Sequence, residues 1–165
     1  MNHEAKAVLL ITGASRGIGA ATALLAGARG YAVGVNYRND DRAAEAVVRQ
    51  IEQAGGMAVA LQADVAREQD VLDMFEACAH RLGAITGLVN NAGILERQST
   101  LAVMEMDRVR RIFATNVFGT MLCAREAVRR MATSAGGSGG GIVNVSSAAS
   151  RLGSPGEYVD YAAAK

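Results

Sequence analysis

The sequence predicts an α/β fold in which helices cover both faces of a doubly wound parallel sheet. Short apolar runs of strand length alternate with longer segments whose apolar residues recur at helical spacing. A glycine-rich turn joins the first run to the first helical segment. Because parallel strands are joined by helical crossovers, the alternation favours right-handed β–α–β units within one domain spanning residues 1–165.

The expected elements follow one another without a domain linker. The first strand, 7–11, is a continuous apolar run, as in strands buried on both faces. A helix of small residues follows at 17–29. The other expected strands are 31–37, 57–61, 85–89 and 142–145, and the other expected helices cover 44–51, 71–82 and 106–131. The glycine-rich segment 136–141 is interpreted as a surface loop.

The charge balance gives no electrostatic reason to bind nucleic acid or a membrane. Seventeen Lys and Arg residues stand against 16 Asp and Glu residues, for a net charge of +1. No apolar run reaches the roughly 18 residues that span a bilayer, and residues 1–6 lack the apolar core of a signal peptide. Six arginines are interpreted as the solvated side of the long helix rather than a basic patch: Arg108, Arg110, Arg111, Arg125, Arg129 and Arg130.

The cysteines and histidines point away from disulfide and metal chemistry. Cys78 and Cys123 form neither a disulfide framework nor a zinc-binding spacing. Both fall on apolar helix stripes and are expected to be buried thiols. Since His3 and His80 are the only histidines, a histidine-rich metal site is excluded. These features predict a cytoplasmic protein without a metal.

The turn after the first strand has the pattern of a nucleotide-binding site. In this position glycines let the backbone approach a pyrophosphate, and the helix N-terminus supplies free N–H groups. The alternative is a tight turn that needs glycine only for its positive φ. The turn, spaced Gly-x3-Gly-x-Gly, reads Thr12, Gly13, Ala14, Ser15, Arg16, Gly17, Ile18 and Gly19.

The end of the second strand bears on which nucleotide binds. An acidic residue about 20 positions beyond such a turn would accept from the adenosine ribose 2′-hydroxyl, whereas an arginine suits a 2′-phosphate. Here Tyr37 and Arg38 end the strand, and Asp40 and Asp41 come slightly too late. Arg38, helped by Arg16, could hold a phosphate. The pattern favours NADP over NAD, although Arg38 as an ordinary turn residue would leave either cofactor possible.

Polar residues also follow the third and fourth strands, at the edge where such sheets bind ligands. Asp64, before Val65, could accept from the adenine amino group or cap the segment that begins at Ala66. The fourth strand runs into Asn-Asn-Ala-Gly at 90–93, where small residues would let a cofactor ribose pass close to the backbone. Asn90 itself is interpreted as a brace between neighbouring elements.

Three further polar residues lie at informative positions. Asn116 interrupts the apolar stripe of the helix 106–131, where an unpaired amide would cost about 1–3 kcal/mol. It either bonds a backbone carbonyl inside the core or holds a water at the site. Ser146 and Ser147 end the fifth strand, where a serine is often only a turn or cap residue.

The sequence closes on Tyr161 and Lys165, which lie four residues apart and so on one face of a helix. In that arrangement the ammonium can stabilise a phenolate and move a proton donor of reference pKa about 10 toward working pH. Such a pair is common by chance. It becomes informative because the glycine turn, the Asn-Asn-Ala-Gly segment, Asn116 and Ser147 precede it in this order.

Together these motifs resemble the short-chain dehydrogenase/reductase family, and the resemblance spans the whole chain. It is strongest to bacterial oxidoreductases of the glucose 1-dehydrogenase-like and 3-oxoacyl-carrier-protein-reductase-like kinds. The resemblance implies a Rossmann-type sheet and an NADP cofactor, with NAD as the alternative. It also implies a small carbonyl or alcohol substrate and a homodimer or homotetramer.

The resemblance further implies a role for each site residue. Tyr161 would be the general acid/base, and Lys165 would hold the nicotinamide ribose and lower the pKa of Tyr161. Ser147, or Ser146 if the alignment slips, would bond the substrate oxygen, and Asn116 would position a water in a relay to Lys165. The residues expected at the cofactor are Gly13, Ser15, Arg16, Gly17, Ile18, Gly19, Tyr37, Arg38, Asp64, Val65, Asn90, Ala92, Gly93, Tyr161 and Lys165.

The family's pattern continues past this Tyr–Lys helix, with further strands and a lid over the substrate. We therefore interpret the sequence as the N-terminal part of a longer enzyme, truncated after the fifth strand and the start of the catalytic helix. An isolated chain of 165 residues is expected to be inactive and poorly soluble, because its last strand would form an exposed edge.

Two other classes of function stay open at this point. The chain could be a nucleotide-binding module without catalysis, such as a sensor or an inactive partner subunit. It could also serve assembly alone, with the long helix as a dimer face. Tyr161 and Ser147 argue against a pure binder, which needs neither residue.

Overall fold

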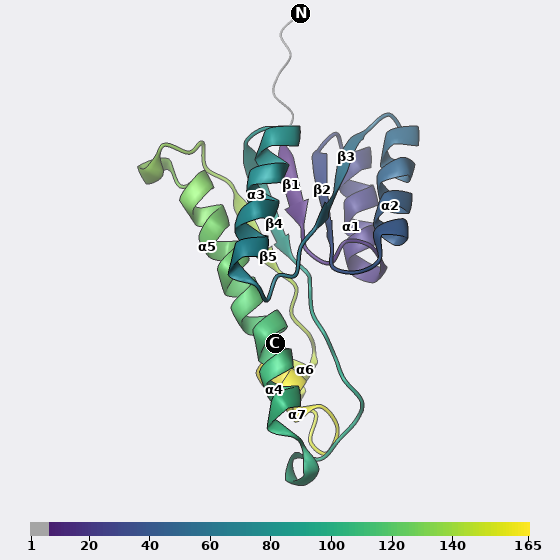
Figure 1. The fold of residues 1–165 in the computed structure, drawn as a ribbon, viewed down its shortest axis with the longest axis vertical. Coiled ribbons are helices and arrows are strands. Elements are labelled where there is room, and N and C mark those ends of the chain that lie inside the picture. Colours follow the sequence, from purple (N-terminus) through teal and green to yellow (C-terminus); the bar gives the residue numbers. More distant parts are fainter. Residues whose placement is uncertain (1–6) are drawn as a thin grey trace, which may run out of the picture.

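A computed structural model describes residues 7–165, so the interpretations of residues 1–6 and His3 lie outside the described part of the chain. Five strands form one sheet in the order β3-β2-β1-β4-β5, and every pairing is parallel (Figure 1). The predicted doubly wound fold is confirmed. The strands are β1 (Val8–Ile11), β2 (Ala32–Tyr37), β3 (Met57–Gln62), β4 (Ile85–Asn90) and β5 (Gly141–Asn144).

The strand order reverses at β1, which pairs with β2 on one side and β4 on the other. In such sheets ligands bind beyond the carboxyl ends of the strands, at the point where the order reverses. The glycine turn follows β1 and the Asn-Asn-Ala-Gly segment follows β4. The topology therefore brings these two motifs to one edge of the sheet.

Helices cover both faces of the sheet because side chains alternate along each strand. Ile11 faces a cluster that includes the buried side of α1 (Gly17–Ala28) and α2 (Asp41–Gln53). Leu10 faces the opposite cluster, which includes residues of α3 (Glu68–Leu82) and α5 (Thr120–Met131). Cys78 and Cys123 are both buried free thiols in that second cluster, as predicted. Burial raises the pKa of each thiol to about 12.

The predicted single helix over 106–131 contains an irregular turn. It consists of α4 (Met106–Phe113), a π-helical turn η2 (Ala114–Gly119) and α5. A π turn inserts one residue and rotates the face that follows it. The buried face therefore continues through Gly119 and Cys123, whereas Met121 is 64% exposed.

The interpretation of the six arginines as one solvated face is wrong at Arg108. Its side chain is buried against Asp160. The other five form ion pairs with acidic side chains: Arg110 with Asp107, Arg111 with Glu96, Arg125 with Glu68, and Arg129 and Arg130 with Glu126. The arginines are thus locally neutralised rather than gathered in a basic patch.

Short helices complete the described chain: η1 (Leu101–Val103), η3 (Thr133–Ala135), α6 (Ala149–Leu152) and α7 (Val159–Ala163). Figure 1 shows α4, α6 and α7 together beyond the carboxyl ends of the strands, away from α1 and α2. Among residues 7–165, no helix combines the length and apolar character that crossing a bilayer requires.

Candidate active site

The glycine turn between β1 and α1 is shaped by close backbone contacts. Gly13 has a φ of +62°, and a Cβ there would stand 2.9 Å from the Ala92 Cα. A Cβ on Gly19 would collide with the Gly13 carbonyl oxygen and stand 2.5 Å from Asn91 Nδ2. Gly17 has a φ of +58° but faces open space. The turn therefore needs glycine for contact at Gly19, for conformation at Gly17 and for both at Gly13.

A buried amide, a half-buried amide and a hydroxyl hold this turn against the neighbouring strands. Asn36 on β2 accepts from the Gly13 N–H at 3.0 Å and donates to the Leu61 and Ala63 carbonyls at 3.1 and 3.2 Å. Asn91 donates to the Thr12 and Gly13 carbonyls at 2.9 and 3.0 Å.

The Thr12 hydroxyl accepts from the Asn91 and Ala92 N–H groups at 3.0 Å each. It thereby joins the end of β1 to the segment after β4. None of Thr12, Asn36 and Asn91 was assigned to the site from the sequence. Asn36 carried the same signal as Asn116, since it is an amide within an apolar run, and the same argument applied to β2 would have found it.

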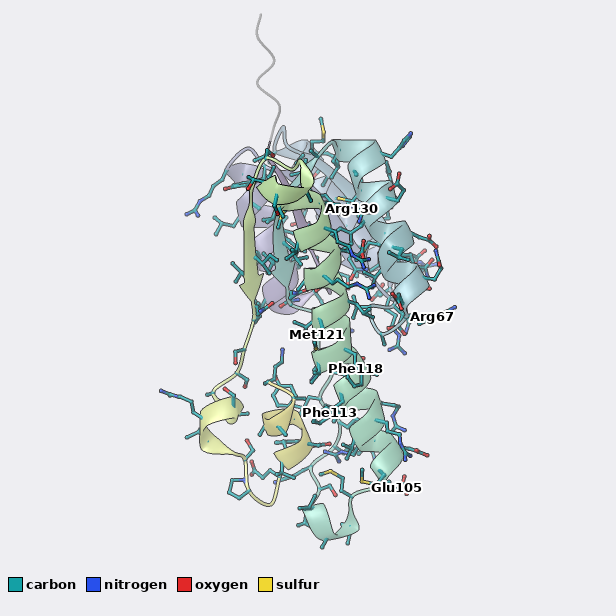
Figure 2. The ribbon with its side chains drawn as sticks, turned by 90° about the vertical axis from the view of Figure 1, so that its left-hand side faces the viewer. Arg67, Glu105, Phe113, Phe118, Met121 and Arg130 are labelled. Atoms are coloured by element: carbon teal, nitrogen blue, oxygen red, sulfur yellow. The ribbon has the colours of Figure 1, made fainter. Side chains whose placement is uncertain are left out.

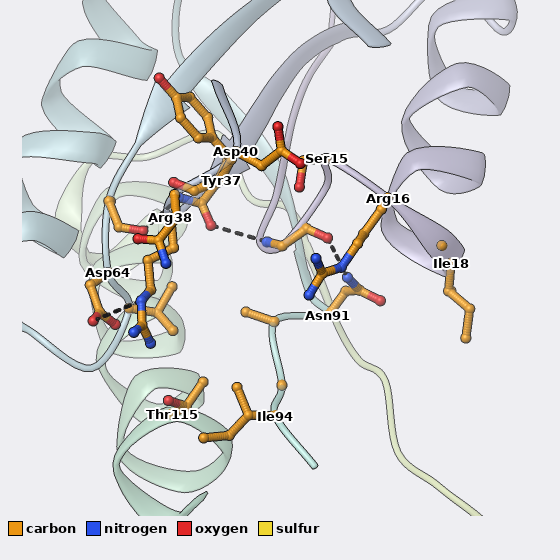
Figure 3. Close-up of a pocket in the computed structure, with 18 residues that line it drawn as sticks. Ser15, Arg16, Ile18, Tyr37, Arg38, Asp40, Asp64, Asn91, Ile94 and Thr115 are labelled. Atoms are coloured by element: carbon orange, nitrogen blue, oxygen red, sulfur yellow. Dashed lines mark hydrogen bonds and ion pairs between the residues drawn. The ribbon is translucent and has the colours of Figure 1, made fainter. Parts of the chain in front are cut away.

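A cavity of about 520 Å³ opens beside the turn (Figure 3). The residues predicted to bind a cofactor that line it are Gly13, Ser15, Arg16, Gly17, Ile18, Tyr37, Arg38, Asp64, Val65, Ala92 and Gly93. Lining residues that were not assigned to the cofactor from the sequence include Asn36, Asn39, Asp40, Asn91, Ile94 and Thr115. Four residues predicted at the cofactor do not line this cavity: Gly19, Asn90, Tyr161 and Lys165. Gly19 instead lies behind the turn, against Gly13 and Asn91.

Arg38 and Asp64 form an ion pair at the rim of the cavity, with 3.5 Å between Arg38 Nε and Asp64 Oδ2. Figure 3 shows the Arg38 guanidinium turned toward Asp64 rather than toward Arg16. Asp64 also accepts from the Ala66 N–H at 3.0 Å and so caps the turn before α3. One oxygen of Asp64 thus serves the cap that was one of its two predicted roles, and the other is paired with Arg38.

Asn90, at the end of β4, braces two neighbouring elements. Its Nδ2 donates to Asn144 Oδ1 on β5 at 2.9 Å and to the Thr120 carbonyl at 3.3 Å. These contacts match the bracing interpretation made from the sequence.

Asn116 makes two hydrogen bonds to the backbone of one residue. Its Oδ1 accepts from the Ile94 N–H at 2.8 Å, and its Nδ2 donates to the Ile94 carbonyl at 3.0 Å. The sequence left two roles open for Asn116, a bond to backbone inside the core or a bond to a water. The structure shows the bonds to backbone. The pair of bonds fixes the segment after β4 against η2, beside Gly93.

Lys165 reaches the same place from the end of the described chain. Its Nζ donates to the Val145 carbonyl at 2.9 Å and lies 6.0 Å from the centre of the Tyr161 ring. A Cβ on Gly93 would stand 3.2 Å from Lys165 Nζ and 3.4 Å from Asn116 Oδ1. Partial burial lowers the pKa of Lys165 below its ordinary value. The structure therefore brings Lys165 and Asn116 next to Gly93, which lines the cavity, and places the Tyr161 ring beside Lys165.

The two candidate serines occupy different environments. Ser147 Oγ accepts from the Ala149 N–H at 3.2 Å, which makes it a cap of the turn before α6. Ser146 Oγ donates to the Lys165 carbonyl at 3.0 Å. The Ser146 hydroxyl is therefore engaged with the backbone next to the lysine, whereas the Ser147 hydroxyl uses an acceptor lone pair and retains its proton for another partner.

Comparison with known proteins agrees with this geometry. Residues 7–165 match the family model described as short chain dehydrogenase. The chain belongs to the short-chain dehydrogenase family. A crystal structure of a short-chain type dehydrogenase/reductase from Mycobacterium marinum superposes with a TM-score of 0.89 at 34% sequence identity. That superposition covers 96% of this chain and 63% of the other.

Two curated family members are similar in sequence. The uncharacterized oxidoreductase YgfF of Escherichia coli (strain K12) is 57% identical over 159 residues, which are 96% of this chain and 64% of the relative. The 3-oxoacyl-[acyl-carrier-protein] reductase of Synechocystis sp. is 40% identical over 158 residues, which are 96% of this chain and 62% of the relative. The chain thus spans less than two thirds of the length of these short-chain dehydrogenases.

Within residues 7–165, no three His, Cys, Asp or Glu side chains lie together in an arrangement that could hold a metal ion. The polar groups gathered at the site of this short-chain dehydrogenase are amides, hydroxyls, an ammonium, a phenol and the charged groups of Arg16, Arg38, Asp40 and Asp64. This set suits binding of a dinucleotide and movement of a proton.

Proposed function

We propose that this protein transfers a hydride between NADP(H) and a carbonyl compound or secondary alcohol, with Tyr161 as the general acid/base. The observation that carries the proposal is the position of Lys165, which is held by Val145 beside the Tyr161 ring. The same ammonium lies next to Gly93, 3.2 Å from where a Cβ would stand, and Gly93 lines the cavity beside the glycine turn. A proton donor and a cation thus lie near a residue of that cavity.

The residues of the glycine turn fit a dinucleotide because they leave space at the backbone. At Gly13 a Cβ would meet Ala92, and the open space beside Gly17 adjoins the first turn of α1. N–H groups at a helix N-terminus favour a phosphate. The turn would hold the pyrophosphate, Arg38 the adenosine side and Lys165 the nicotinamide ribose. When bound, the nicotinamide supplies or accepts the hydride.

The chain's own groups would move the proton. In the reducing direction the Tyr161 hydroxyl gives its proton to the substrate oxygen, and the Ser147 hydroxyl donates a hydrogen bond to that oxygen. The adjacent Lys165 ammonium stabilises the phenolate that remains. In the opposite direction the phenolate removes the proton of the alcohol. Asn116 keeps the segment before Ile94 in place, and its part in a water relay to Lys165 stays a prediction.

The preference for NADP rests on Arg38, a bidentate donor at the rim of the cavity. Its pairing with Asp64 means that a 2′-phosphate would have to compete with a carboxylate that is 24% exposed. Exposed ion pairs contribute little, about 0–1 kcal/mol. A dianionic phosphate is therefore expected to replace Asp64 as the partner of Arg38.

The test is a titration of the native-length protein with NADPH and NADH, followed by reduction assays on ketones, aldehydes and sugars. Tyr161→Phe should lower kcat by at least about 100-fold, because the proton donor is lost. The Kd for NADPH should change by less than about threefold. The matched control is Tyr31→Phe, because Tyr31 directly precedes β2 and so lies at the amino ends of the strands, away from the site. It should leave kcat unchanged.

Substantial turnover by the Tyr161→Phe variant would end the assignment. Binding of NADPH by the wild type without turnover of any substrate would favour a nucleotide-binding module. Absence of both would favour an assembly role. A cytoplasmic location and a homodimer or homotetramer stay predictions, and analytical ultracentrifugation of the native-length protein tests the second.

A further inference from the structure

A buried ion pair joins the helix of Tyr161 to the long helix. Arg108 on α4 donates through Nε to Asp160 Oδ2 at 2.7 Å and through Nη2 to Asp160 Oδ1 at 3.2 Å. The side chains are only 9% and 1% exposed. Asp160 directly precedes Tyr161, and its Oδ1 also accepts from the Tyr161 N–H at 2.9 Å. The pair is therefore one hydrogen bond away from the backbone of the proposed acid/base.

The short helix α7 depends on such contacts for its position. Helices of one or two turns do not form by themselves in water, so tertiary contacts must hold the five residues of α7. Burial alone would raise the pKa of Asp160, but hydrogen bonds from Arg108 and from the Tyr161 N–H lower it below its ordinary value. Asp160 is therefore an anion at neutral pH, and Arg108 has a buried charge to neutralise.

Arg108 also connects α7 to the segment that leaves the nucleotide cavity. Its Nη1 donates to the Arg97 carbonyl. Next to that contact, the Ser99 N–H donates to the Glu157 carbonyl at 2.9 Å, and Gln98 donates to the Glu157 side chain at 3.0 Å. One guanidinium thus meets the segment after β4, the α4 helix and the α7 helix.

We propose that Arg108 and Asp160 are positioning residues, which hold the Tyr161 hydroxyl in reach of the substrate and nicotinamide. The proposal rests on the proposed function, since it assigns a role to the same tyrosine. A fork of two hydrogen bonds fixes both the distance and the direction between α4 and α7, which a single apolar contact would not do.

A second buried carboxylate supplies the matched control. Glu126 on α5 has a side chain only 3% exposed and accepts from Arg129 at 2.9 Å and from Arg130 at 2.6 Å. Figure 2 shows Arg130 at the far end of the long helix from Glu105, the residue just before α4. Glu126→Gln therefore disturbs a comparable ion pair without touching α7.

The experiment compares Arg108→Met, Asp160→Asn and Glu126→Gln in the native-length protein. Each variant is measured for thermal stability, for kcat and cofactor KM, and by fluorine NMR of 3-fluorotyrosine, with the Tyr161 signal identified by its loss in Tyr161→Phe. Arg108→Met and Asp160→Asn should lower kcat about 100-fold, the size expected for a misplacement of about 1 Å. Their cofactor KM should change by less than about threefold. The Tyr161 signal should shift or broaden.

Glu126→Gln should lose stability yet keep both kcat and the Tyr161 signal. Arg108→Lys, which keeps the charge but not the fork, should recover part of the rate. If Arg108→Met does not fold, the double variant Arg108→Met/Asp160→Leu replaces the pair by apolar side chains, which often preserves stability. It should fold and still lose kcat.

Equal kcat and an unchanged Tyr161 signal in folded Arg108 and Asp160 variants would overturn the proposal. Failure of the proposed function has a different signature. In that case Tyr161→Phe keeps its rate, while the NMR comparison still decides whether the ion pair positions the tyrosine.

Discussion

The cofactor side and the tyrosine side of this molecule are held by different kinds of contact. On the cofactor side, amides and hydroxyls bond backbone groups in or just beyond adjacent strands, as Asn36 does on β2 and Asn91 does just after β4. On the tyrosine side, helices project beyond the sheet (Figure 1). Charged side chains join these helices, as Arg108 and Asp160 do. The contacts that hold the glycine turn are neutral hydrogen bonds, whereas the contact that joins α7 to α4 is ionic.

The difference has a physical consequence for how each side responds to change. A neutral amide that is bonded to strand backbone is part of the rigid sheet. Removing it is therefore expected to lower both the stability of the protein and its affinity for the dinucleotide. A buried ion pair between a short helix and a long one sets geometry. Removing this ion pair is therefore expected to lower kcat more than it lowers stability or cofactor affinity.

The largest expected effect tests the backbone contacts of the cofactor side. Gly19→Ala should lower the free energy of unfolding by about 3 kcal/mol and abolish dinucleotide binding, because its Cβ would collide with backbone at Gly13. Gly17→Ala, whose Cβ meets no atom within 4 Å, should cost only the strain of its positive φ, about 1–2 kcal/mol. Urea unfolding and calorimetric titration measure both variants, and equal losses would contradict a close backbone contact at Gly19 that Gly17 lacks.

Asn36→Ala should cost about 2–3 kcal/mol of stability, because it leaves the Gly13 N–H and two strand carbonyls without their side-chain partner. Asn39→Ala, at an exposed position of the same region, should stay within about 0.5 kcal/mol of wild type. Denaturant unfolding of the two variants gives the comparison. A stable Asn36→Ala variant would show that the amide does not brace the turn.

Arg38→Ala should weaken NADP binding about tenfold, equivalent to about 1.4 kcal/mol, because a charge-assisted contact to the 2′-phosphate is lost. Its NAD affinity should be nearly unchanged. Asp64→Asn should instead strengthen NADP binding, because the Asp64 carboxylate no longer competes with the phosphate for Arg38. Titrations with both dinucleotides decide between this scheme and an Arg38 that plays no part in selectivity.

The smallest expected effect is a difference between the two sides in how their stability depends on pH. Burial would raise the pKa values of Asp160 and Glu126, but their arginine partners lower both below the ordinary 3.8 and 4.5. Stability from these groups is present above the unfolded-state values and is lost as pH falls through the folded-state values. Hydrogen exchange measured as the pH falls below about 4 should show α7 losing protection before the strand ends around Asn36. If α7 and the strand ends lost protection at the same pH, the ion pair would not be what keeps α7 in position.

Most of the sheet could be predicted from the sequence because buried parallel strands leave continuous apolar runs. The strand predicted at 57–61 is observed as Met57–Gln62, and that predicted at 85–89 as Ile85–Asn90. The motifs at 12–19 and 90–93 fell at the carboxyl edge because the strand order determines where each strand ends.

The pairings between distant side chains could not be predicted. Arg108 and Asp160 are 52 residues apart, and nothing in a helical pattern distinguishes an arginine that points to solvent from one that meets a carboxylate on another helix. Asp64 was assigned to a ligand or a cap, and its pairing with Arg38 required the register of β2 against β3. Periodicity also carries no signal for the extra residue of η2.

That extra residue sets the rotational phase between the two sides. Each helical residue turns the helix by about 100°, so removing one residue from Ala114–Gly119 would swing α4 relative to α5 by about that angle. Arg108 would then face away from α7 while Cys123 kept its place in the core. The Thr120 hydroxyl, which donates to the Asn116 carbonyl at 2.9 Å, supplies a partner for that carbonyl within the widened turn. The extra residue of η2 therefore sets the angle at which the face of α4 that meets α7 follows the face of α5 that packs on the sheet.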